Sequence, residues 1–263
     1  MLKNLVRPKI NPLITYLRPK DIPQVLDALE TIPCDKLYIN YYPYPHPHRI
    51  ARDYFLAHPE YTHLCIVTND LIVTSNHFDK MMSNVKNHPM LSVICGVCNV
   101  DGDQEKTKWN ICLDLPPIKE KNRSYHWVKM NDELRGIWLR VAFAGFPFMV
   151  CSRHIIEGLM QRPERPGYDG CDLFGVDGFA TDLWFCTSLW ERHIPIFCDT
   201  GIEMKHLRYE YELQVGIKEP NCELYKGEQI LNVTDECERL IHVTKDKIFK
   251  GSKSVQRAFE VRI

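Results

Sequence analysis

The sequence predicts an α/β fold in which helices flank a mixed, mostly parallel sheet. Over the first hundred residues, short apolar runs rich in β-branched residues alternate with segments whose apolar residues recur at helical spacing. This alternation is typical of parallel strands joined by right-handed helical crossovers. Strands are therefore expected near residues 12–18, 36–42, 63–68 and 91–97, with helices near 23–32, 48–56 and 75–85.

The second half of the chain is less regular. Residues 99–133 are polar and are expected to form loops or an inserted hairpin. An apolar run over 139–152 leads into a predicted helix at 153–160, and a Gly- and Pro-rich segment at 163–178 is a candidate lid. A helix at 181–191, capped by Thr181 or Asp182, and a strand at 194–198 complete the expected domain.

Composition and charge exclude several classes of protein. The 263 residues carry a net charge of -1, which gives no electrostatic basis for broad binding to nucleic acid. The longest apolar run, residues 137–151, is interrupted by Arg140, Gly145 and Pro147, so no transmembrane segment is expected. The first residues have no apolar signal-peptide core, and most of the 11 cysteines lie in apolar runs, so reduced, buried thiols and a cytoplasmic location are expected.

Asp70 is the strongest candidate for chemistry. Ligands of open α/β sheets bind beyond the carboxyl ends of the strands, and Asp70 directly follows the apolar run that ends at Asn69. A carboxylate at this place can hold a hard divalent cation against a diphosphate. The alternative is that Asp70 forms an Asx turn or caps the next helix.

Several motifs resemble those of glycosyltransferases of the GT-A fold. Residues 68–73, Thr-Asn-Asp-Leu-Ile-Val, resemble the D-x-D or N-D-D segment whose last Asp binds metal and nucleotide. Residues 144–150, followed by Ser152 and Arg153, resemble the acceptor-side strand and its helix. Residues 181–186 resemble the E-D-x-x-F-C helix start of inverting, family-2-like members.

The last motif is the strand at 198–202 with a terminal His206, and the resemblance then covers about residues 11–207. It implies a catalytic domain at 1–210, in which residues 1–100 bind the nucleotide and 101–210 the acceptor, and a C-terminal extension at 211–263. Two departures matter. Thr68 replaces the first Asp of the first motif, and Thr181 replaces the Glu of the third.

The resemblance implies transfer of a sugar from a nucleotide-sugar, with UDP or GDP as nucleotide, to the hydroxyl of a glycan or another acceptor. Mn²⁺ or Mg²⁺ held by Asp70 and His206 would neutralise the leaving diphosphate. Asp182 at a helix N-terminus would be the general base, and Asp177 is the rival base or an acceptor-binding group. The alternative for Asp182 is a plain helix cap.

Residues at the ends of the first two strands and on the next helix are expected to bind the nucleotide. Tyrosines there would stack on the base and arginines would meet the diphosphate, although packing tyrosines and solvated helix charges are common alternatives. The expected nucleotide-binding residues are Tyr16, Arg18, Asn40, Arg49, Asn69 and Asp70.

Two other functions remain open. A nucleotidyltransferase would also use a nucleotide and a metal, but it usually has a Gly-rich basic loop after the first strand, and residues 17–21 contain no glycine. A non-catalytic protein that binds glycans or nucleotides on the same fold would explain the missing acids at Thr68 and Thr181.

Overall fold

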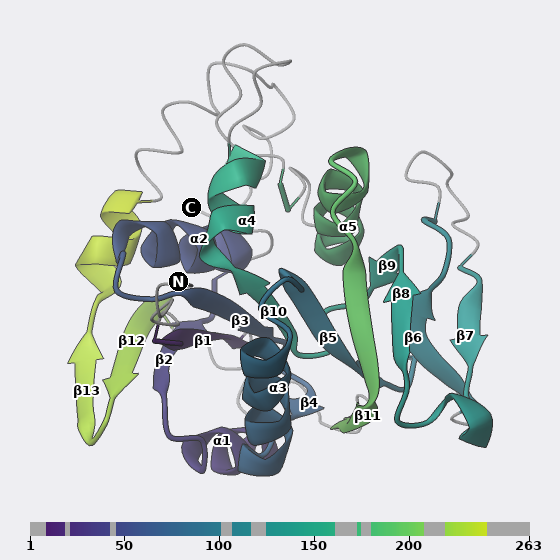
Figure 1. Ribbon diagram of the computed structural model, residues 1–263. Coiled ribbons are helices and arrows are strands. Elements are labelled where there is room, and N and C mark those ends of the chain that lie inside the picture. The colour runs from purple at the N-terminus through teal and green to yellow at the C-terminus, as the bar shows by residue number, and fades with distance from the viewer. Residues whose placement is uncertain are drawn as a thin grey trace, which may run out of the picture.

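A computed structural model of the protein describes residues 9–18, 22–42, 46–100, 107–116, 125–160, 173–174, 180–207 and 219–240. It has an α/β architecture, with a ten-stranded mixed sheet between two layers of helices (Figure 1). None of the helices in these ranges has the length and apolar character needed to span a bilayer. The cysteines in these ranges are free thiols, and all but Cys34 are buried, as the sequence predicts.

Strand order brings the two halves of the chain together in one sheet. The order is β13-β12-β2-β1-β3-β10-β5-β11-β4, and β8 also pairs with β11. The strands of this sheet are β1 Pro12–Arg18, β2 Asp35–Asn40, β3 His63–Val67, β4 Leu71–Ile72, β5 Val93–Cys98, β8 Trp138–Val141, β10 Met149–Ser152, β11 Ile196–His206, β12 Asn221–Lys226 and β13 Gln229–Asn232.

The prediction of a mostly parallel sheet is wrong. Strand β1 is parallel to β2 and β3, and β5 is parallel to β11, but the other described pairings of this sheet are antiparallel. The reason lies in the connections. After β5 the chain forms an insertion beside the carboxyl ends of the parallel strands, so β10 starts at that edge and runs back between β3 and β5.

Helices cover both faces of the sheet, as Figure 1 shows. Helices α1 Pro23–Glu30 and α3 Ser75–Asn87 pack on one face, while α2 His46–Ala57, α4 Arg153–Met160 and α5 Thr181–Glu191 pack on the other. Each face has its own apolar core cluster, because side chains alternate across the sheet. Capping of α5 differs from the sequence prediction, since α5 begins after Ala180.

The polar middle segment forms the inserted hairpin that the sequence predicts. Strands β6 Lys108–Cys112 and β7 Trp127–Lys129 pair antiparallel, and β9 Phe143–Ala144 joins β6 to give a three-stranded sheet. This second sheet packs beside α5. It therefore forms one wall at the carboxyl edge of the main sheet.

The described part of the C-terminal extension, residues 219–240, belongs to the main sheet. Strand β12 pairs antiparallel with β2 and covers its edge, and β13 is the outermost strand (Figure 1). The Asn40 side chain at the end of β2 donates to Oδ1 of Asn221 over 2.6 Å. The extension is thus a continuation of the half predicted to bind the nucleotide.

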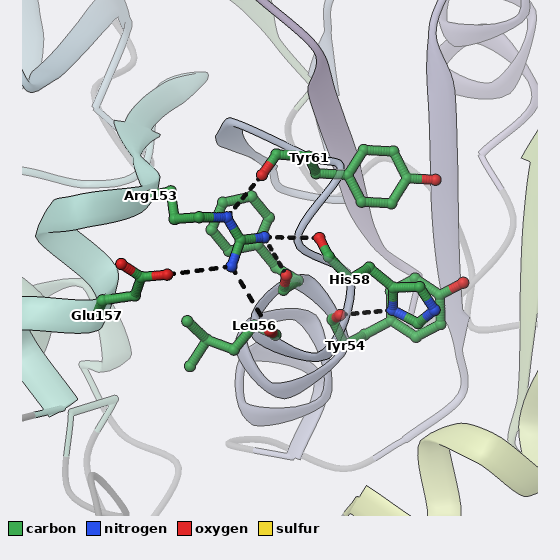
Figure 2. Close-up of polar contacts among 7 residues, drawn as sticks. Tyr54, Leu56, His58, Tyr61, Arg153 and Glu157 are labelled. Atoms are coloured by element: carbon green, nitrogen blue, oxygen red, sulfur yellow. Dashed lines mark hydrogen bonds and ion pairs between the residues drawn. The ribbon is translucent and has the colours of Figure 1, made fainter.

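Arg153, the first residue of α4, anchors α4 to the end of α2 (Figure 2). Its guanidinium lies 4.2 Å from the ring centre of Phe55 and also meets Glu157. Nε and the two Nη atoms donate to backbone carbonyls at and beyond the C-terminus of α2. The accepting residues are Phe55, Leu56, His58 and Tyr61. These carbonyls include some that a helix end leaves without intrahelical partners.

We expect Arg153→Lys to destabilise the fold. An ammonium cannot reach several carbonyls at once as the planar guanidinium does, so the free energy of unfolding should fall by roughly 2 kcal/mol. Urea denaturation followed by circular dichroism measures this change. The control is Arg135→Lys, at an arginine that is 49% exposed and ion-paired with Asp132 and Glu203. Equal losses in the two variants would contradict the anchoring role of Arg153.

Candidate functional site

A cavity of about 410 Å³ opens at the carboxyl ends of β3 and β5. Three backbone segments form most of its wall, namely the turn at residues 68–71, the end of β5 with residues 98–100, and the start of α5 at residues 180–182. Open α/β sheets bind ligands beyond the carboxyl ends of their strands, which is where this cavity lies.

Asp70 and His206 meet in this cavity. Nε2 of His206 lies 3.1 Å from Oδ2 of Asp70, and both side chains are largely buried, at 13% and 18% exposure. The pairing of β11 with β4 aligns them, because His206 is opposite Leu71 and the Leu207 amide donates to the Asp70 carbonyl. Thr74, not Asp70, caps α3, so the helix-cap alternative for Asp70 is wrong.

The hydrogen bond of the other ring nitrogen of His206 limits the protonation states open to the Asp70 and His206 pair. Nδ1 lies 3.1 Å from the backbone carbonyl of Asn99, and because a carbonyl only accepts, this hydrogen bond requires the proton on Nδ1. Nε2 then faces a carboxylate, which also only accepts. The contact between Nε2 and Asp70 therefore needs a proton, carried by the ring or by the carboxyl group, or a metal cation.

The geometry of the pair fits a divalent cation. Two ligands on adjacent corners of an octahedron with bonds of about 2.1 Å are about 3 Å apart, close to the observed separation. The Oδ1 atom of Asn99 is also buried without a hydrogen-bond partner in the described part of the chain. Among the described residues, no group of three or more His, Cys, Asp or Glu side chains is placed to hold a metal ion. A cation at Asp70 and His206 would thus need further ligands, such as Asn99 Oδ1, water or a bound ligand.

Asp182 faces the same cavity from the first turn of α5. Its Oδ1 accepts from the Leu183 amide over 2.8 Å, and Oδ2 would lie 3.4 Å from a Cβ atom placed on Gly145. The helix cap is Ala180, so the prediction that Thr181 or Asp182 caps α5 is wrong by one or two positions. Asp182 still lies within the first helical turn, where the helix dipole favours its ionised form.

Asn110 braces the wall between these groups. Its Oδ1 accepts from the Cys98 amide, which precedes Asn99, and its Nδ2 donates to the Gly145 carbonyl beside Asp182. The Asn110 carbonyl in turn accepts from the Gly145 amide. One buried amide thus links the Asp70 side of the cavity to the Asp182 side.

The backbone beside the cavity is strained. Phe146 and Ala180, which line it, have φ values of 50° each, and nearby Phe148 has 49°. Bulky or Cβ-bearing residues rarely adopt this left-handed region, which costs of order 1–3 kcal/mol each. Such strain persists where the surrounding fold imposes it, and it is concentrated at functional sites.

His48 forms part of the cavity floor. It is 2% exposed, and its ring forms a cluster with Phe146 and Phe174 at centroid distances of 5.2 and 5.1 Å. Burial lowers the pKa of His48 from 6.5 to about 3. The imidazole is therefore neutral at ordinary pH, so His48 adds an uncharged aromatic ring and no positive charge to the cavity lining.

Three residues predicted to bind the nucleotide have other roles here. Tyr16 is fully buried, so it presents no face to a base, and its hydroxyl donates to the Asn69 carbonyl and steadies the turn before Asp70. Asn40 is 2% exposed and joins β2 to β12. Arg49 is 4% exposed and does not line the cavity. Tyr16 is buried in the core on the face covered by α1 and α3, Arg49 is buried on α2, and β12 covers the end of β2 at Asn40.

The remaining predicted residues divide into two groups. Asn69 lines the cavity together with Asp70. Asp177, most of the candidate lid, and the side chain of Arg18 lie outside the described residues.

The structure adds four cavity residues that sequence reasoning missed, namely His48, Asn99, Asn110 and Trp127. Asn99 carried a usable signal, because it follows the predicted strand at 91–97 just as Asp70 follows the strand before it. Asn110 and Trp127 come from the inserted hairpin, whose pairing no local pattern specifies.

No protein-family model and no curated protein matches the sequence. Among solved structures, the chain is similar to the viral protein A197 from STIV, with 14% sequence identity and a TM-score of 0.50. The similarity covers 86% of this chain and 91% of that one. At this identity the likeness extends to the fold alone.

We expect His48 to destabilise the protein in acid. Because its pKa is lower in the folded than in the unfolded state, the unfolded state binds more protons below pH 6.5, and stability is lost as the pH falls toward 3. Between pH 7.5 and pH 4.5 the wild type should lose about 3 kcal/mol of unfolding free energy through His48, and His48→Leu should not show this loss. Urea denaturation at both pH values measures it, with exposed His126→Leu as the control. Identical pH dependence of wild type and His48→Leu would refute the assignment.

Proposed function

We propose that the protein is a glycosyltransferase of the GT-A type that transfers a sugar from a nucleotide-sugar to an acceptor hydroxyl. The observation that carries this proposal is one cavity with the Asp70 and His206 pair on one side and the Asp182 carboxylate on the other. A metal-binding pair beside an independent carboxylate supplies the two functions that glycosyl transfer requires, which are neutralisation of the leaving group and removal of a proton.

The donor side is the wall formed by residues 68–71 and 98–100. No Lys or Arg belongs to the described cavity lining, so the charge of a diphosphate must be met there by something other than a basic side chain. Asp70 and His206 would hold Mn²⁺ or Mg²⁺, which when bound supplies Lewis-acid stabilisation of the departing UDP or GDP. Thr68 and Asn69 add neutral polar groups beside the pair.

The acceptor side is the wall formed by α5 and the three-stranded sheet. Asp182 accepts the proton of the acceptor hydroxyl, the acceptor oxygen forms a bond to the anomeric carbon, and the bond from that carbon to the diphosphate breaks. One carboxylate acting in a single in-line displacement gives inversion at the anomeric carbon. Gly145 borders this carboxylate, since a Cβ atom there would lie 3.4 Å from Asp182 Oδ2 and at a tighter 3.2 Å from Asn110 Nδ2.

The GT-A assignment and the cytoplasmic location are parts of this proposal. The mixed sheet, with its cavity at the carboxyl ends of β3 and β5, agrees with the order of the sequence motifs on which the resemblance rests. The buried free thiols favour a reducing compartment. A non-catalytic binding protein is the second candidate, and the observation that favours it is Thr181, which lines the cavity where the resemblance expects a Glu.

We expect a nucleoside diphosphate to stabilise the protein only when a divalent cation is present. Because Asp70 and His206 would bridge to the diphosphate through the cation, Asp70→Asn should weaken binding of UDP or GDP by at least about tenfold. Thermal denaturation with each nucleotide, with and without Mn²⁺, measures the effect. Asp132→Asn, at a carboxylate that is 97% exposed, is the matched control. Equal stabilisation with and without cation would exclude this donor site.

We expect Asp182→Asn to abolish turnover but leave donor binding intact. Loss of a general base typically costs about 10²- to 10⁴-fold in rate, whereas the isosteric amide preserves the helix start. The measurement is release of UDP or GDP from a panel of nucleotide-sugars with Mn²⁺, with and without mixed glycan acceptors, beside nucleotide binding by the same variant. Unchanged turnover in Asp182→Asn would show that another group is the base, whereas no turnover by the wild type with any donor would favour the binding protein.

A further inference from the structure

Trp127 is a partly exposed aromatic residue in the cavity wall, and nothing in the proposed chemistry uses it. It lies on β7 of the three-stranded sheet. Its indole stacks against the ring of Tyr125 at 4.5 Å with an interplanar angle of 3°, and Phe143 lies at 5.8 Å. One face of the indole is therefore covered by Tyr125, and Trp127 contributes to the lining of the cavity.

We propose that Trp127 is a stacking platform for a sugar ring of the acceptor, so that the acceptor is a neutral saccharide. This inference rests on the proposed function in one respect, because only a transferase has an acceptor. Binding of a saccharide at Trp127 does not itself require turnover. A pyranose has a flat face of C–H groups and a rim of hydroxyls. A fixed aromatic ring beside a few polar groups matches both of these properties.

The position of the platform relative to Asp182 supports an acceptor subsite. Trp127 is paired with Cys112 on β6, and Asn110 lies two residues earlier on the same strand, a step of about 7 Å. Asn110 donates to the Gly145 carbonyl, and Gly145 borders the Asp182 carboxylate. A single sugar ring is comparable in size to this step, so a ring stacked on Trp127 can direct a hydroxyl toward Asp182.

The charge and the exposed aromatic surface of the cavity further restrict the class of ligand. The described lining has no Lys or Arg, while Asp70 and Asp182 both contribute carboxylates, which disfavours an anionic acceptor. The buried rings of Phe146 and His48 continue the apolar floor, but each is only 2% exposed, so Trp127 offers the larger accessible aromatic surface. A nucleobase could also stack on an indole, and the experiment must separate these two ligands.

The test is saturation-transfer NMR on the full chain without nucleotide or metal. The probes are neutral disaccharides (maltose, cellobiose, lactose and chitobiose) and, separately, uridine and guanosine. Wild type, Trp127→Phe and Trp127→Ala are compared, with Trp190→Ala as control, because Trp190 is 52% exposed on α5 and does not line this cavity. Folding of each variant is checked by circular dichroism.

We expect at least one disaccharide to bind the wild type and the Trp190→Ala control equally. Affinity should fall by at least about tenfold in Trp127→Ala and stay within about threefold in Trp127→Phe, which keeps an aromatic face. Absence of disaccharide binding, binding unaffected by Trp127→Ala, or Trp127-dependent binding of the nucleosides alone would each overturn the inference.

The two proposals can fail separately. Metal-dependent donor hydrolysis without Trp127-dependent saccharide binding would retain the transferase and remove this subsite. Trp127-dependent saccharide binding by a protein that neither binds nor cleaves any donor would keep the subsite and remove the transferase.

Discussion

The insertion of β10 between β3 and β5 is the constraint on which the rest of the molecule depends. It pairs with both neighbours through the same short segment, with Met149 opposite Ile66 on one side and Cys95 on the other. Because β10 runs against its neighbours, the chain that enters it crosses the carboxyl edge just where the turns after β3 and β5 emerge. The residues before it, including Gly145 and Phe146, are thereby held against those turns, and Arg153 fixes its other end to α2.

This arrangement explains how the fold tolerates strain at the cavity. The left-handed conformations of Phe146 and Phe148 flank Pro147, and Gly96 donates to the Pro147 carbonyl, so the distorted segment is bonded to β5. Both aromatic side chains are buried, and their burial offsets the conformational cost. The site is therefore held at strand ends, the turn after β3 and the start of α5, while Trp127 comes from the inserted hairpin.

The sequence was informative wherever a local pattern determined the outcome. The strands at β1, β2, β3 and β5 follow from apolar runs, and Asp70 and His206 meet because each stands where a strand of one sheet ends. The direction of β10, the burial of Arg49 and the pairing of Asn40 with Asn221 depend on contacts distant in sequence. Local periodicity does not encode such contacts. It correctly predicts that Tyr16 and Asn40 lie near strand ends, but both side chains are buried, so they cannot bind a nucleotide there as the sequence predicts.

The covering of β2 by β12 has a consequence for how the protein is made. Asn40 and its partner Asn221 are separated by 181 residues. At a typical elongation rate, the ribosome therefore synthesises β12 roughly 10 to 40 s after β2, and the edge of β2 stays unpaired during that time. During that interval a strand with unpaired backbone groups is available to any other nascent or unfolded chain. The yield of folded protein should therefore depend on chaperones that bind early in translation, and the hairpin of β12 and β13 closes the sheet last.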